Sequence, residues 1–356
     1  MVYLKEMEVF KNTEKFIGHI SQIGGVRRFK MLEGLSKGME VIEVNNGSGM
    51  VFNVLVDKCL DIFNLSFKSY PVSFISAAGM VSPMYYDARV YGWLKTFGGG
   101  LFVTCGLTNV GEPCTYEGDG YGLHGNISCI AAENVNVDQH WVNNEYAIEI
   151  SGNIRQVKSL VENIVIDRKI SSAMFKNEIR VTDTITNQGQ TKRPFMILYH
   201  MNFGYPLINP HCEVIVPIKS TEGFNEYCEK RKEQCLEIPE PDNTYLEETY
   251  IHKVYDKKNR SGFCIINNKE YPGYGVSVSY PTDVLHNLGQ NNFFREKEYF
   301  IAFEPCNNEI KGAEYEKERG NLYFIEPGET VYIDLIIKLD TDTSSLKNEI
   351  ENLITN

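Results

Sequence analysis

Long apolar runs, clusters of basic residues and cysteines at paired spacings are all missing from this sequence of 356 residues. No apolar run approaches the roughly 20 residues of a membrane-spanning helix. The net charge is −12, and Lys and Arg occur singly, so we expect neither a nucleic acid nor a membrane as partner. The N-terminal residues 1–16 are charged throughout and lack the apolar core of a signal peptide.

The cysteine pattern also excludes classes of protein. Nine cysteines is an odd number, and the closest two, Cys228 and Cys235, lack the short spacing of a zinc knuckle. Without a secretion signal, we interpret them as reduced thiols of a cytoplasmic protein. Neither a disulfide framework nor a thiolate metal site is expected.

What the sequence does contain is period-2 alternation, the pattern of half-buried strands. The clearest case is 330–339, which places five apolar residues on one face: Val331, Ile333, Leu335, Ile337 and Leu339. Further strands are predicted at 145–154, 177–186, 195–203, 273–280 and 298–304. Helical periodicity is confined to 344–355, and the polar segment 227–248 is predicted to lie on the surface.

Many strands separated by polar turns favour an all-β fold, an antiparallel sandwich or barrel with few short helices. No repeat and no Pro/Ser-rich linker divides the sequence. We therefore predict one large β domain over residues 1–356.

One motif has the spacing of a dinucleotide-binding site but lacks the flanking elements of one. Residues 120–125, GYGLHG, satisfy the spacing G-x-G-x-x-G of dinucleotide-binding proteins. Such a site needs a hydrophobic strand before the motif and a helix after it, and the flanking residues suit neither. We interpret the segment as a loop.

Three residues stand out as candidates for acid–base chemistry. His124 lies between glycines that would allow a ligand to approach the backbone. His200 lies alone in the apolar strand 195–203, where a packed core histidine is the alternative. Glu304 should point away from the face of Ile301 and Phe303 at a strand end, although a surface glutamate is the simpler interpretation.

Two further regions carry polar or glycine-rich patterns. Residues 91–111 contain three consecutive glycines, Trp93 and Asn109, which suits either a binding site or a tight β corner. Lys58 and Asp61 are expected either to pair at the surface or to form the polar wall of a sugar pocket. Histidine and a carboxylate can exchange protons near neutral pH, but the spacing alone leaves open whether these residues meet.

Six motifs in the same order make the sequence resemble the galactose mutarotase-like superfamily, in particular its aldose 1-epimerase-related branch DUF4432. They are GSGMVFNVLVDKCLDI, YGWLKTFGGGLFVTCGLTNVG, GLHGNIS, YHMNFGYPLI, FEPCNN and EPGETVYIDL. The resemblance covers nearly the whole chain. It implies a large antiparallel β-sandwich with a sugar cleft and an isomerase that interconverts the α and β anomers of a monosaccharide.

The resemblance also implies roles for individual residues. Glu304 would take the proton of the anomeric hydroxyl, His200 would protonate the ring oxygen, and His124 would stabilise developing charge. Substrate contacts would come from Lys58, Asp61, Trp93, Asn109, Tyr199 and Asn202. Neither a redox cofactor nor a metal would be required.

Departures from the family pattern and alternative functions bear on the substrate. Lys58 and Asn126 stand where the family often has arginine, and no aspartate aligns with the one that binds sugar hydroxyls in galactose mutarotases. The alternatives are a non-catalytic carbohydrate-binding protein, or a sugar epimerase, isomerase or lyase acting at another carbon. The expected partner is a small-molecule sugar, and a homodimer is left open.

Overall fold

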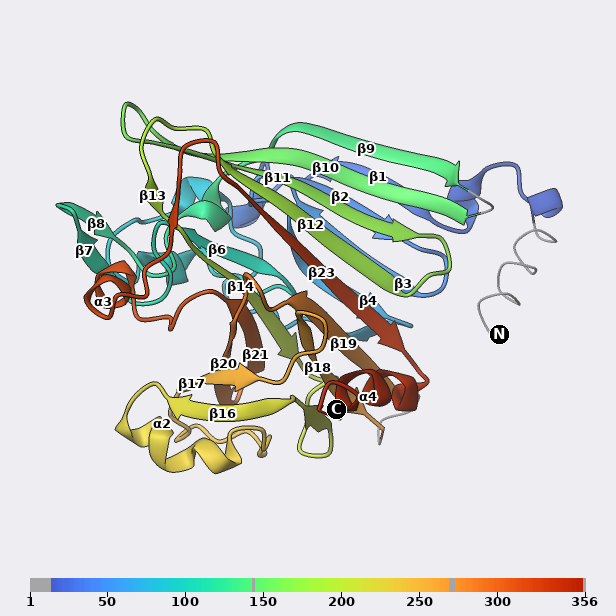
Figure 1. Cartoon of the computed structure of the whole chain (residues 1–356). Coiled ribbons are helices and arrows are strands. Elements are labelled where there is room, and N and C mark those ends of the chain that lie inside the picture. The colour runs from blue at the N-terminus through green and yellow to red at the C-terminus, as the bar shows by residue number, and fades with distance from the viewer. Residues whose placement is uncertain (1–13, 143–144, 269–272, 355–356) are drawn as a thin grey trace.

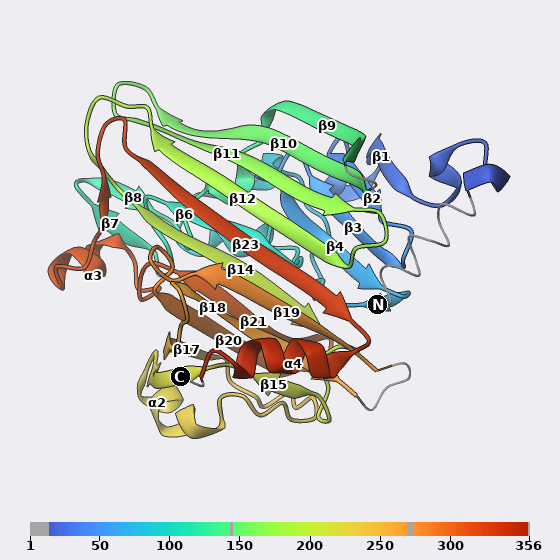
Figure 2. The same cartoon turned by 45° about the vertical axis from the view of Figure 1, so that its right-hand side comes forward.

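Strands with one apolar face make up most of the structure. The structure is a computed structural model, and it describes residues 14–354 except 143–144 and 269–272. The strands form three large antiparallel sheets and two small ones (Figures 1 and 2). The predicted all-β antiparallel sandwich is therefore confirmed.

The largest sheet has eight strands, in the order β15 (Glu213–Ile215), β18 (Arg260–Asn267), β19 (Tyr274–Pro281), β23 (Thr330–Asp340), β12 (Glu178–Asn187), β11 (Glu162–Ala173), β10 (Glu145–Lys158) and β9 (Glu133–Val142). A six-stranded sheet has the order β16 (Ile218–Gly223), β17 (Glu248–Val254), β20 (Asn287–Arg295), β21 (Glu298–Cys306), β14 (Met196–Gly204) and β6 (Val103–Leu107).

The N-terminal part forms a five-stranded sheet of β1 (Gly25–Lys30), β2 (Glu40–Asn45), β3 (Met50–Leu55), β4 (Asp61–Phe67) and β5 (Tyr70–Pro71). Two small ribbons pair β7 (Cys114–Tyr116) with β8 (Asp119–Tyr121), and β13 (Arg193–Pro194) with β22 (Phe324–Ile325).

Helices are few and short in the described residues. The α-helices are α2 (Glu226–Arg231), α3 (Ala313–Glu318) and α4 (Thr343–Glu351). Single 3₁₀ turns cover Glu14–Phe16, Ile20–Gln22, Gly34–Ser36, Pro83–Tyr85, Gly92–Lys95, Ile127–Cys129 and Lys232–Gln234. None of these helices is long and apolar enough to cross a membrane.

The predicted C-terminal helix is confirmed as α4. The side chain of Asp342 caps its N-terminus by accepting a hydrogen bond from the backbone N–H of Ser345 at 3.4 Å. Leu346 and Ile350 are buried, and Ile350 packs against Cys264 and Ile266 of β18. The apolar stripe of the helix thus covers one end of the eight-stranded sheet (Figure 2).

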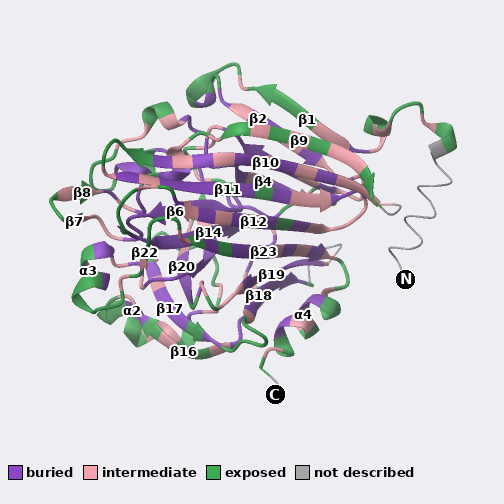
Figure 3. Ribbon diagram, turned by 45° about the horizontal axis from the view of Figure 1, so that its top comes forward, coloured by how far each residue is buried: buried purple, intermediate pink, exposed green. Residues whose placement is uncertain are grey.

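The main core fills the space between the large sheets. All five apolar residues predicted for one face of β23 are buried in it. Figure 3 shows how buried residues recur along the strands. From the six-stranded sheet, β14 contributes Ile197, Tyr199, Met201 and Phe203. Because strand side chains alternate, His200 projects from the opposite face, away from this core.

Two sequence predictions need correction. The strand predicted to end at Glu304 is longer: β21 continues to Cys306, with Pro305 opposite Leu288 of β20. On the other side of β21, the ladder with β14 has no pair at Pro305. Proline fits there because it has no backbone N–H to donate. The segment 227–248 is only partly a surface excursion, because Cys228 and Cys235 are buried against Tyr250.

All nine cysteines lie within the described residues, and each has a free thiol. Residues 1–13, where we predicted no signal peptide, lie outside the described part of the chain.

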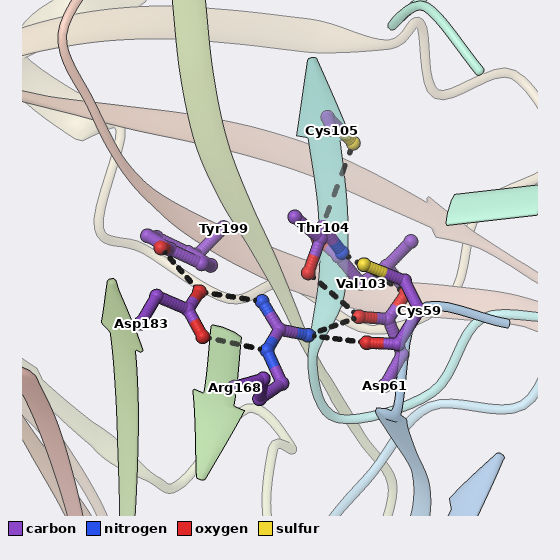
Figure 4. A network of polar contacts seen from close by, with 8 residues as sticks. All are labelled: Cys59, Asp61, Val103, Thr104, Cys105, Arg168, Asp183 and Tyr199. Carbon is purple, nitrogen blue, oxygen red and sulfur yellow. Dashed lines mark hydrogen bonds and ion pairs between the residues drawn. The ribbon is translucent and has the colours of Figure 1, made fainter. Parts of the chain in front are cut away.

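A buried ionic network joins the three large sheets (Figure 4). Arg168 of β11 donates to both carboxylate oxygens of Asp183 on β12, at 2.8 and 2.6 Å, and to Asp61 of β4 at 3.0 Å. Asp61 also accepts from the backbone and side chain of Thr104 on β6, and Asp183 accepts from the hydroxyl of Tyr199 on β14 at 2.7 Å. Every charge in this network therefore has a partner of opposite sign.

Replacing Arg168 should destabilise the fold strongly, because Arg168→Leu leaves two buried carboxylates without their cation. We expect a loss of about 3–5 kcal/mol in the free energy of unfolding, measured by urea denaturation. Arg180→Leu is the matched control: Arg180 pairs with Asp334 in the same sheet but is partly exposed, so its loss should stay below about 1 kcal/mol. Equal losses in the two variants would contradict this account.

Candidate active site

A cleft of about 560 Å³ opens on the face of the six-stranded sheet that points away from the main core. Its floor consists of side chains from β14, β17, β20 and β21, and its walls come from residues 91–97, from the loops around Gly111 and His124, and from the start of α2. His124, His200, Glu304 and Trp93 all line it.

Strand register brings His200 and Glu304 together. The ladder pairs Met201 with Phe303 and Leu198 with Cys306, so the same register sets His200 of β14 opposite Glu304 of β21. Directly opposed residues of antiparallel strands lie on the same face. The Nε2 atom of His200 is 3.2 Å from Oε1 of Glu304, and both side chains are buried at the floor of the cleft.

The next strand leaves room for the carboxylate. Gly289 of β20 pairs with Glu304, and a Cβ atom at Gly289 would lie 3.0 Å from its Oε2. Burial raises the pKa of Glu304 from its ordinary value of 4.5 to about 8, and the negative charge of Glu247 adds to the effect. Burial lowers the pKa of His200 well below its usual range, and His124 adds to this while Asn202 opposes it.

His124 approaches the pair from a loop. Its backbone has a φ of 56°, in the left-handed region, and the following Gly125 has a φ of 69°. A side chain at Gly125 would collide with the carbonyl of Gly106, so glycine lets the loop lie against β6. The ring centroids of His124 and His200 are 5.7 Å apart.

The hydrogen bonds of His124 define its protonation. The backbone N–H of Gly111 donates to Nδ1 of His124 at 3.3 Å. Because Nδ1 accepts a hydrogen bond, neutral His124 carries its proton on Nε2. Burial lowers the pKa of His124 to about 4, which keeps the ring neutral near pH 7.

Aromatic rings form the wall next to the histidines. Trp93 stacks on Phe97 with a centroid distance of 4.6 Å, and it lies 4.9 Å from the ring of His124. The indole N–H of Trp93 donates to Ser128 at 3.0 Å, which fixes the orientation of the ring. Phe97 lies 5.4 Å from His200.

Five of the six residues predicted to contact the substrate do not line this cleft. Lys58 donates to the carbonyl of Thr96 at 2.8 Å, and Asp61 belongs to the Arg168 network. The side-chain amide of Asn109 donates to the carbonyls of Glu112 and Gly122 and accepts from the backbone N–H of Ala313 in α3.

The other two belong to β14 itself. Tyr199 points into the core, because it alternates with His200. Asn202 is buried beside His200 and donates to the carbonyl of Gly100 at 2.8 Å. Its Oδ1 atom, like Nδ1 of His200, has no hydrogen-bond partner among the described residues.

Close packing of the backbone explains the glycine-rich segments. A side chain at Gly98 or Gly99 would meet the carbonyl of Gly79 or Phe74, so this run is a tight backbone corner. The GYGLHG segment runs from β8 into a loop, in agreement with the prediction that it is no dinucleotide motif.

Sequence reasoning missed several polar residues of the cleft. Glu247 directly precedes β17, within the segment predicted to be a surface excursion, and accepts a hydrogen bond from Asn291 at 2.9 Å. Asn291 also donates to Thr249 at 3.0 Å. The only signal was the alternation along β17 and β20, which sets Thr249 and Asn291 on the face of Glu304. Among the described residues, no three His, Cys, Asp or Glu side chains are grouped as a metal site requires.

The raised pKa of Glu304 predicts how stability depends on pH. Between about pH 4.5 and 8 the folded protein retains a proton on Glu304 that the unfolded chain releases, so this contribution to stability falls as pH rises. Glu304→Gln cannot titrate. We therefore expect the free energy of unfolding of the wild type to fall relative to Glu304→Gln across this range and to level off above it.

Urea denaturation of both proteins at intervals from pH 5 to 9 measures this difference. His124 is present in both proteins, so its own titration largely cancels. A difference that stays constant with pH would show that Glu304 ionises normally in the fold.

Solved structures share this fold. A candidate aldose 1-epimerase from Klebsiella pneumoniae matches with a TM-score of 0.86 and 19% identity, covering 93% of this chain and 88% of its own. A galactose mutarotase-like protein from Clostridium acetobutylicum has a TM-score of 0.63 and 11% identity, covering 90% and 99%. A galactose 1-epimerase from Lactobacillus acidophilus has a TM-score of 0.50 and 11% identity, covering 89% and 99%.

At these identities the likeness shows the galactose mutarotase-like fold. A comparison with curated protein sequences gave no match. The family model of the domain of unknown function DUF4432 matches residues 36–339, in agreement with the resemblance of the sequence motifs. The chain therefore belongs to the DUF4432 family.

Proposed function

We propose that the protein is a cofactor-independent isomerase of the aldose 1-epimerase type, which interconverts the α and β anomers of an aldose. The observation that carries this proposal is the contact of 3.2 Å between His200 and Glu304 at the floor of the cleft. An acid and a base side by side are what reversible opening of a hemiacetal ring requires. The mutarotase-like fold of the relatives supports the same reaction class.

The pair would work with one shared proton. The raised pKa of Glu304 and the lowered pKa of His200 favour a resting state with a protonated carboxyl group and a neutral imidazole. Movement of that proton from Oε1 to Nε2 gives the reactive state, a carboxylate beside an imidazolium. Both states hold the same number of protons, so the conversion needs no exchange with solvent.

Ring opening then follows from the reactive state. Glu304 accepts the proton of the anomeric hydroxyl while the Nε2–H of His200 protonates the ring oxygen, and the bond between C1 and the ring oxygen breaks. Rotation about the C1–C2 bond exposes the other face of the aldehyde. The same two groups, with their roles reversed, close the ring as the other anomer.

His124 would act as a hydrogen-bond donor and not as an acid. Its Nδ1 accepts from Gly111, so the Nε2–H of neutral His124 is free to stabilise negative charge on a sugar oxygen. The rings of Trp93 and Phe97 would pack on the C–H surface of the sugar. Glu247, together with Asn291, supplies polar groups for hydroxyls.

Substitution within the pair tests the proposal. In Glu304→Gln and His200→Gln we expect the enzyme-dependent exchange between anomers to fall by about 10²–10⁴-fold, because each variant removes the proton-transfer group and keeps a similar shape. Two-dimensional NMR exchange spectroscopy on a panel of free aldoses, corrected for the spontaneous rate, measures the effect.

The controls are Glu314→Gln and His211→Gln, which change exposed residues outside the cleft and should leave the rate unchanged. Exchange that is equally fast in the pair variants would contradict the proposed roles. Sugar binding without any wild-type exchange would instead indicate a carbohydrate-binding protein.

A further inference from the structure

The cleft carries negative charge without a balancing cation. Four glutamates line it: Glu112, Glu247, Glu298 and Glu304. Among the described residues of the lining there is neither lysine nor arginine. A cleft lined by one sign of charge concentrates ligands of the opposite sign.

The carboxylates at the rim have only neutral partners in the described part of the chain. Glu112 accepts from the hydroxyl of Tyr91 at 2.8 Å, and Glu298 accepts from the backbone N–H of Ala77 at 3.1 Å. Glu247 accepts from the side-chain amide of Asn291. Hydrogen bonds of this kind orient a carboxylate but leave its charge in place.

Two cations lie close to the cleft but are engaged elsewhere. The guanidinium of Arg295 lies 5.0 Å from the ring of Phe293 and donates to the carbonyl of Tyr245. The ammonium group of Lys311 lies 5.2 Å from the ring of Phe224, in an adjoining pocket. Each stacks on an aromatic ring of the lining, and neither lines the cleft itself.

Of the glutamates that line the cleft, Glu247 is the one whose charge raises the pKa of Glu304. Glu247 directly precedes β17 and lines the same cleft as Glu304, and Asn291 of the intervening strand β20 bonds it. The charge of Glu247 is felt at Glu304, where it opposes ionisation. A cation bound between the two would relieve this repulsion.

We propose that the cleft prefers an aldose that carries an ammonium group next to the anomeric carbon, a 2-amino-2-deoxy sugar, and that it excludes anionic aldoses. The inference rests on the proposed function, which sets the anomeric carbon beside Glu304. The amino nitrogen on C2 is two bonds away from that carbon, within reach of the charge of Glu247 and of the carboxylate that Glu304 forms in the reactive state. A uronate or a sugar phosphate would bring a second negative charge into a cleft without a cation.

The test compares sugars of the same shape and different charge. The probes are glucosamine, glucose and glucuronate, together with the corresponding galacto sugars, at a pH where the amino group is charged. N-acetylglucosamine and N-acetylgalactosamine control for bulk at C2. We expect exchange to be fastest for the amino sugar and slowest for the uronate, with a preference that shrinks as salt is added.

A variant that removes one charge tests whether Glu247 causes the preference for the amino sugar. Glu247→Gln should lower the ratio of kcat/KM for the amino sugar to kcat/KM for the neutral sugar about tenfold, the size expected for one partly solvated charge pair. Glu314→Gln removes an exposed glutamate of α3 and should leave the ratio unchanged. Calorimetric binding of the same sugars reports the charge preference independently of catalysis.

The outcomes separate the two proposals. Absence of exchange for every sugar, with the amino sugar bound best, overturns the proposed reaction and keeps the charge preference. Exchange of the uronate as fast as the neutral sugar, or a ratio unchanged in Glu247→Gln, overturns the preference and keeps the reaction. Equal binding of all three charge classes also overturns it.

Discussion

The position of the site depends on the ion pairs that the buried guanidinium of Arg168 makes. The guanidinium joins β11 to β12 through Asp183 and to β4 through Asp61, in the interior between the sheets. Tyr199 of β14 bonds the same Asp183, so the strand that carries His200 is tied to this network. A shift of β14 would leave a buried charge or hydroxyl without a partner, which proteins rarely tolerate.

The two faces of β14 therefore have different roles: one stabilises the core and the other lines the cleft. On the core face, the Tyr199 hydroxyl, the Arg168 guanidinium and both aspartates have partners. On the cleft face, Nδ1 of His200 has no partner among the described residues, and Nε2 of the same ring contacts the carboxyl group of Glu304 at 3.2 Å. A fully satisfied network is rigid and inert, whereas groups without partners are available to a ligand.

The fold followed well from the sequence because alternation is a local property. The alternation correctly predicted the apolar face of β23 and the direction of the Glu304 side chain, which points away from that of Phe303. The register that brings Glu304 to His200 is not local, since it depends on which strands become neighbours. The family resemblance, and not the spacing, suggested that these residues meet.

The polar residues were harder to predict for the same reason. Lys58 and Asp61 look like a polar wall in sequence, but their partners are a carbonyl and a guanidinium far along the chain. Arg168 itself gave no signal, because a single arginine in a strand usually faces solvent. Glu247 was hidden in a charged segment whose course over the sheet only the structure shows.

The central claim is that His200 and Glu304 act as one proton-carrying unit, and a double-mutant cycle on kcat/KM for anomer exchange tests it most directly. The proteins are the wild type, His200→Gln, Glu304→Gln and the variant with both changes. Residues that act as a unit lose their effect together, so we predict that the double variant is no slower than the slower single variant. Losses that multiply in the double variant would show two independent groups and would contradict the account.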